Sequence, residues 1–201
     1  MYILISRASL CILINILTVT DALEDPVAFH AIKGGKNDAY ISFQAMVTNN
    51  KAKFNPLYGV FECEEPGLYL FIFSAMSKLE SDLRISLRVN RVPVSTVFAG
   101  SKTSYNSASG SAILSLSVKD IVYLFVEKGE IYESNQVNRA YTSFSGVQLS
   151  KSKNGGFLSS LIGRDASAEF ATNSSLNKSV IETDQNDRIF EHLKEMRKRL
   201  V

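Results

Sequence analysis

The chain has 201 residues, of which 45% are hydrophobic, and a formal net charge of +2. This length is sufficient for one globular domain with its own core and one appendage. A net charge so close to zero gives no support for nucleic acid or an anionic membrane surface as a partner.

Residues 1–22 have the layout of a secretory signal peptide. A short start with one arginine precedes an apolar run over residues 10–19, and small residues follow near Ala22, where we expect cleavage. A membrane anchor is the alternative, but it needs about 20 apolar residues, and Asn15 and Asp21 interrupt this run. The pattern therefore predicts a secreted, extracellular chain with no membrane span.

The sequence contains two cysteines. Removal of the signal peptide would take Cys11 with it, so Cys63 would have no partner for a disulfide within the chain. A lone cysteine in a secreted chain is either a buried small hydrophobic residue or a partner in an interchain disulfide, and the position of Cys63 between Phe61 and the apolar stretch that follows favours burial. The fold must then be held together by packing.

From residue 27 to residue 149, short segments rich in β-branched and aromatic residues alternate with clusters of Gly, Asn, Asp, Ser and Pro. The predicted strands are 27–32, 40–47, 59–63, 67–76, 83–90, 93–98, 111–118, 121–127 and 141–149. Short strands separated by turn residues, with no helical pattern between them, indicate an all-β sandwich or jelly roll. A parallel α/β fold would need crossover helices, and the sequence leaves no room for them.

Two predicted strands are apolar on both faces. In the stretch LYLFIF, Leu68, Leu70 and Ile72 share one face. The opposite face carries Tyr69, Phe71 and Phe73. The segment IVYLFV behaves in the same way, whereas the segment DLRISLRVN has one polar face. A sandwich strand needs only one apolar face, so a partner subunit or the C-terminal tail must cover the other.

The order of motifs resembles the globular head domain of complement C1q. The motifs are VAFHA, ISFQAMVTN, FNPLYGVFECEEPGLYLFIFSA, SGSAILSL, Asp120-Ile121-Val122 and TSFSGVQL, and we place the domain at residues 25–150. The resemblance implies a ten-stranded jelly roll, like that of tumour necrosis factor, that assembles as a homotrimer. It also implies that aromatic strand faces line the subunit interface or the core; the candidates are Phe43, Tyr69, Phe71, Phe73, Tyr123, Phe125 and Phe144.

The sequence departs from this family at three places, one of which is Tyr58, at a position where a small hydroxyl residue is common. Lys119 occupies the position of the usual glycine before Asp120, although that turn would use glycine's freedom at positive φ. No Gly-X-Y repeat is present, so no collagen stalk is expected. Some relatives bind calcium near the trimer axis, and Asp120 is the matching acid here; the alternative is that Asp120 is a turn residue. Apart from possible calcium, no cofactor is expected.

Residues 151–201 lie beyond the resemblance. Residues 151–180 are rich in Ser and Asn and are expected to form a flexible linker, with N-glycan acceptor patterns at Asn173 and Asn177. Residues 181–201 predict an amphipathic helix with acids at its start and basic residues at its end. This helix could pack on its own β domain, associate with its trimer mates or contact a membrane through its basic end.

Catalysis finds little support in the sequence. The chain has two histidines, His30 and His192, and no Gly-x-Ser-x-Gly or His-Glu-x-x-His motif. We therefore predict that the protein is not an enzyme.

The favoured function is recognition of a glycan, microbial surface or cell-surface receptor by a secreted, lectin-like trimer of innate immunity. Candidate contacts are Lys102, Tyr105 and Asn106, in the polar loop 99–109. The alternatives are a structural component of an extracellular matrix and a cytokine-like ligand for a receptor.

Overall fold

The computed structural model describes residues 25–100 and 103–152. These residues form eleven strands, and within them the chain contains no helix. The strands are β1 (Ala28–Asn37), β2 (Tyr40–Asn50), β3 (Lys53–Asn55), β4 (Val60–Glu62), β5 (Gly67–Ser77), β6 (Leu83–Val89), β7 (Val92–Ala99), β8 (Ser107–Leu116), β9 (Ile121–Lys128), β10 (Ile131–Tyr132) and β11 (Ser143–Lys151). The all-β prediction is confirmed.

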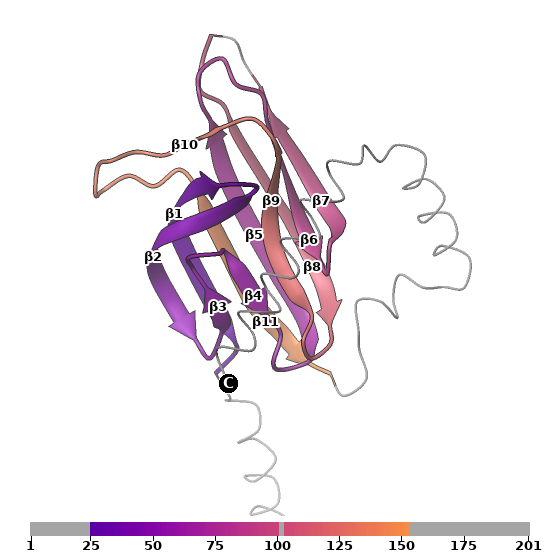
Figure 1. Ribbon diagram of the computed structural model, residues 1–201. Coiled ribbons are helices and arrows are strands. Elements are labelled where there is room, and N and C mark those ends of the chain that lie inside the picture. The colour runs from indigo at the N-terminus through magenta and orange to yellow at the C-terminus, as the bar shows by residue number, and fades with distance from the viewer. Residues whose placement is uncertain (1–24, 101–102, 153–201) are drawn as a thin grey trace, which may run out of the picture.

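The strands are arranged in two layers (Figure 1). One layer has the order β2-β1-β11-β5-β8, and the short strand β10 pairs with the end of β5, beyond the part of β5 that pairs with β11. The other layer has the order β3-β4-β9-β6-β7. Every pairing is antiparallel, and a single residue pair, Tyr40–Phe125, joins the layers. This is the jelly-roll arrangement that the sequence predicted.

Two strands were missing from the prediction, and one begins earlier than expected. The missing strands β3 and β10 have three and two residues, too short for an alternating pattern to show. β8 begins at Ser107 rather than residue 111, because Ser, Ala and Gly here pair with the full length of β5. Counting β10, the sandwich has eleven strands where ten were expected.

The expected signal peptide, C-terminal helix and both glycan acceptor sites lie outside the described residues, as does Lys102. Of the expected linker, the structure describes only Lys151 and Ser152. Lys151, placed there by the prediction, is instead the last residue of β11 and pairs with Gly67. Ser152 continues this contact by donating its backbone N–H to the Pro66 carbonyl over 3.0 Å.

The core between the layers is built largely from phenylalanine rings. Phe29 stacks on Phe54 with ring centroids 4.3 Å apart, and Phe144 meets Phe29 edge-on at 5.2 Å. Phe71 packs against Phe61 at 5.7 Å. Aromatic pairs in such offset and edge-on geometries add to the free energy gained from burial itself.

The aromatic face of β5 points into this core and not toward a neighbouring subunit. Tyr69, Phe71 and Phe73 are at most 1% exposed within the single chain. Of the two placements expected for these rings, subunit interface or core, the single chain has them in the core, because the facing layer has already buried them. Phe43 and Phe144 belong to the same core.

Candidate functional site

Several apolar side chains of β5 and β8 are exposed on the outer face of the first layer. We define the outer face as Leu68, Leu70 and Ile72 of β5 together with Ile113 of β8. Leu68, Ile72 and Ile113 are 37%, 49% and 61% exposed. Ile113 is the direct cross-strand partner of Leu70, so the four residues form one patch. A contiguous exposed apolar patch on a sheet is typical of an interaction surface.

Small polar residues surround this patch. His30 and the Ser145 hydroxyl share a hydrogen bond of 2.7 Å, and Ser145 lies directly opposite Ile72. Ser74 and Ser143 share another, at 2.9 Å. These side chains are short and already paired, so they leave the patch accessible to a flat partner.

Strand β9 is also apolar on both faces, but its outward residues are buried within the chain. Its outward residues Tyr123 and Phe125 are 3% and 4% exposed, in a second cluster with Val60. The Arg88 guanidinium lies 3.8 Å from the centre of the Phe125 ring, and Arg88 donates to the Ser86 hydroxyl and to Glu127. Burial raises the pKa of Tyr123. This outer face is therefore covered within the chain.

Asp120 organises the turn between β8 and β9. Its carboxylate accepts hydrogen bonds from the Asn90 side-chain amide at 2.6 Å and from the Ser117 backbone N–H at 2.8 Å. Lys119, before it, has a φ of 76°, in the left-handed region that favours glycine. The Lys119 backbone N–H donates to the Cys63 carbonyl over 2.7 Å. The turn thus keeps the geometry of a glycine turn without the glycine.

Calcium binding at Asp120 stays a prediction. An ion would compete with the donors from Asn90 and Ser117 for the two carboxylate oxygens. The described residues contain no group of three or more His, Cys, Asp or Glu side chains that could hold a metal. Residues 25–100 and 103–152 also include no helix suited by length and hydropathy to span a bilayer.

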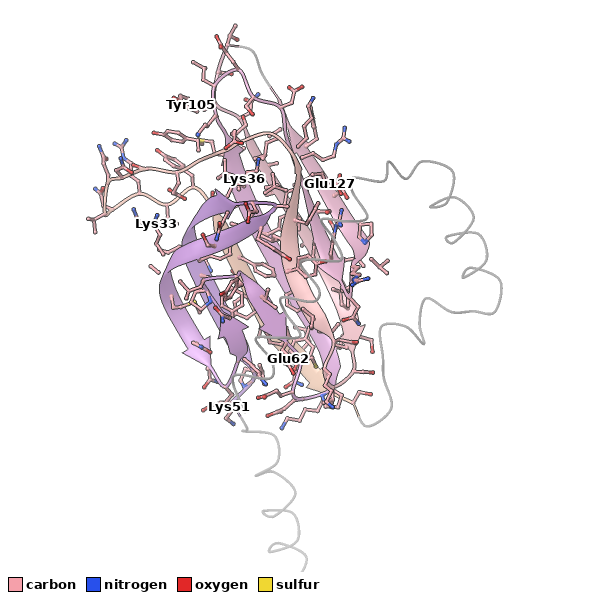
Figure 2. The ribbon with its side chains drawn as sticks, viewed as in Figure 1. Lys33, Lys36, Lys51, Glu62, Tyr105 and Glu127 are labelled. Carbon is pink, nitrogen blue, oxygen red and sulfur yellow. The ribbon has the colours of Figure 1, made fainter. Side chains whose placement is uncertain are left out.

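The two candidate loop residues that the structure describes have different environments. Tyr105 is 48% exposed, and its ring lies 4.5 Å from that of Tyr132, which lies 5.7 Å from that of Tyr141. The side-chain amide of Asn106 donates a hydrogen bond to the Gly100 carbonyl, so it stabilises the loop itself. Figure 2 shows Tyr105 at the opposite end of the sandwich from Lys51 and Glu62.

Sequence reasoning missed Tyr132 and Tyr141. They come from β10 and from the segment before β11, and neither has a pattern that points to Tyr105. The available signal was compositional: the chain has eight tyrosines and no tryptophan, and tyrosines in turn-rich segments are candidates for contact surfaces.

Cys63 is buried, as expected. Its thiol donates to the Glu65 carbonyl, which also accepts from the Tyr69 hydroxyl and the Gln148 side-chain amide. Burial raises the pKa of the Cys63 thiol to about 11. The thiol is therefore protonated and unreactive at neutral pH.

The two antiparallel layers define an all-β jelly-roll domain with an exposed apolar outer face. A family model described as the C1q domain matches residues 27–149, more than half of the chain. The chain therefore belongs to the C1q domain family, and the resemblance noted in the sequence is confirmed.

Known relatives agree with this assignment. The chain is 34% identical to Protein HP-25 homolog 1 of Bos taurus over 84 residues, which is 42% of this chain and 39% of the relative. It is 30% identical to a Complement C1q subcomponent of Mus musculus over 121 residues, or 60% of this chain and 44% of the relative. The chain thus matches less than half the length of either relative.

Solved structures show the same fold. The globular domain of zebrafish Complement 1qA has a TM-score of 0.51 at 23% identity, covering 64% of this chain and 100% of that one. Murine APRIL has a TM-score of 0.51 at 13% identity, covering 62% of this chain and 100% of that one. At these sequence identities, the similarity shows only that the fold is shared.

Proposed function

We propose that the chain is a secreted homotrimeric recognition protein that binds a glycan, a microbial surface or a cell-surface receptor through its loops. The observation that supports assembly is the outer face of β5 and β8. The opposite face of β5 already closes the core, so in one chain the outer leucine and isoleucine side chains are left partly open to water. Their burial between copies would contribute about 25 cal/mol for each Å² removed from water.

A trimer would suit weak recognition of a repetitive surface. Three heads bound together raise the effective concentration of each site once the first has bound. We propose no catalytic role, since the sequence has neither a Gly-x-Ser-x-Gly nor a His-Glu-x-x-His motif.

Sedimentation equilibrium of the deglycosylated secreted protein tests the assembly. The wild type is expected to have the mass of three chains, and Ile113→Lys the mass of one with an unchanged far-ultraviolet spectrum. Val118→Lys is the matched control, since Val118 is also exposed but lies in the β8–β9 turn outside the outer face. A monomeric wild type at micromolar concentration would refute the trimer.

Binding assays separate recognition from its two alternatives. Attachment to microbes or glycans that soluble sugar competes away supports recognition. Co-extraction with insoluble matrix, without sugar competition, would support a structural role. Saturable binding to one cell type would support a cytokine-like ligand.

A further inference from the structure

Three tyrosines from separate segments form a continuous aromatic strip at one end of the sandwich. We define the tyrosine strip as Tyr105, Tyr132 and Tyr141. The centroid distances of 4.5 and 5.7 Å and the tilts of 46° and 40° place each ring in contact with the next. Tyr105, at the outer end, is about half exposed.

The hydroxyl groups of the strip have no hydrogen-bond partner among the described residues. None of the three is buried without a partner either, in contrast to the Tyr40 hydroxyl. Tyr105, which is about half exposed, thus offers an apolar ring face, and the strip offers free phenol groups along its edge, an arrangement suited to an amphipathic ligand. A sugar ring has matching chemistry, with C–H groups on its faces and hydroxyls around its edge.

Hydrogen bonds from two sides fasten the base of the segment between Tyr132 and Tyr141. The Glu133 carboxylate accepts from the backbone N–H groups of Tyr141 and Thr142, at 3.1 and 2.9 Å. From the other side, the Lys33 ammonium donates to the carbonyls of Ser134 and Gln136, at 3.2 and 2.6 Å. Figure 1 shows this segment projecting from the body of the sandwich. A loop conformation that exists before the ligand arrives lowers the entropy lost on binding.

Arg139 of this loop and Lys33 of β1 are cations that form no ion pair with a carboxylate among the described residues, and the Glu133 carboxylate is bonded to backbone N–H groups. The side chain of Arg139 is exposed and has no hydrogen bond or ion pair within the described residues. The Lys33 ammonium contacts carbonyl groups and no carboxylate within the described residues. Arg139 is two residues from Tyr141, at most about 7 Å along the backbone. An anionic group on a ligand that contacts the strip would lie within reach of this guanidinium.

We infer that the tyrosine strip and Arg139 form a binding site for a glycan with a carboxylate-bearing sugar ring. The sugar stacks on Tyr105 and Tyr132, its hydroxyls bond the free phenol groups, and its carboxylate pairs with Arg139. This inference rests on the proposed recognition function and specifies its ligand. The strip has the length of about two sugar rings, whereas a specific protein partner would need a contact of about 800 Å² on each side.

Calorimetric titration of the full secreted chain tests the site with two probes. Hyaluronan tetrasaccharide carries carboxylates, and chitotetraose is a neutral oligosaccharide of similar ring shape. The wild type is expected to bind hyaluronan tetrasaccharide at least about fivefold more tightly than chitotetraose. Tyr105→Ala should weaken hyaluronan binding about tenfold, while Tyr105→Phe, which keeps the ring, should weaken it less. Arg139→Gln should bring hyaluronan affinity down to that of chitotetraose.

Phe98→Ala is the matched control, because Phe98 is an exposed aromatic residue on β7, outside the strip. It should leave both affinities unchanged. Equal binding of the two probes, or unchanged hyaluronan binding by Tyr105→Ala, would overturn the inference. So would absent sugar binding combined with a Tyr105-dependent, protease-sensitive cell receptor, which would make the strip a protein-binding surface.

The tetrasaccharide reports on one site at a time, so its binding does not depend on trimer formation. Sedimentation of the same samples therefore separates the two claims. A trimer that binds microbes but neither probe would refute only the sugar site. A monomer that binds the acidic probe would refute only the trimer.

Discussion

The two faces of β5 have nearly the same hydrophobicity and different roles. Tyr69, Phe71 and Phe73 are sealed between the layers, whereas Leu68 and Ile72 on the other side are open to solvent. On β9 the second apolar face is closed within the chain by Arg88 and its neighbours. An apolar strand face therefore indicates a contact, but the contact can be with the core, with a cation or with another molecule.

The largest expected effect comes from comparing adjacent residues of β5. In the Ile113→Lys background, where self-association is removed, Phe71→Ala should lower the free energy of unfolding by about 3–5 kcal/mol. Ile72→Ala, at a side chain that is about half exposed, should lower it by only about 1 kcal/mol. Urea unfolding measures both, and Phe71→Leu gives a smaller loss if the alanine variant does not fold. Similar losses at both positions would mean that the outer face stabilises the single chain.

A second pair of neighbours compares the two faces on β11. A Cβ atom added at Gly146 would meet the ring of Phe29 and would lie 2.8 Å from that of Phe71. Gly146→Ala should therefore lower the free energy of unfolding by about 1–3 kcal/mol through overpacking. Ser145→Ala, on the outer face, should lower it by less than about 1 kcal/mol. Thermal unfolding of both variants tests this, and a tolerated Gly146→Ala would show that the inner face has spare room.

The β8–β9 turn allows a third variant that should alter stability without altering either face. Lys119→Gly should raise the free energy of unfolding by about 0.5–1 kcal/mol, because glycine adopts a φ of 76° without steric cost. Val118→Gly is the control, since Val118 is not at positive φ, and it should destabilise. Sedimentation should show the wild-type mass for both. Destabilisation by Lys119→Gly would indicate that the lysine side chain makes a compensating contact.

The last comparison concerns the pH dependence of the stability that the buried Cys63 thiol contributes, which does not change near neutral pH. Its pKa is raised to about 11 in the folded chain from an ordinary value of 9.0, so the folded state holds this proton more tightly than the unfolded state. The resulting stabilisation is fully present below pH 9 and is lost as the pH rises toward 11. The stability difference between wild type and Cys63→Ala should accordingly shrink over this range in urea titrations. A constant difference would mean that solvent reaches the thiol.

The class of fold and most of the strands could be predicted from the sequence. Alternation and turn residues such as Pro66-Gly67 are local signals, so β5, β6 and β9 could be placed from neighbouring residues alone. The same locality explains the misses: β3 and β10 are too short to alternate, and the small residues at the start of β8 resemble a loop until their pairing with β5 is known.

Which apolar face of β5 lies inside could be learned only from the packing of the two layers. A period of two separates two sets of side chains but does not say which set meets the second layer. The partners of Asp120 and the meeting of Tyr105, Tyr132 and Tyr141 likewise depend on contacts between segments distant in the chain. Such contacts form only when the strands pair in their long-range order, so no local pattern in the sequence encodes them.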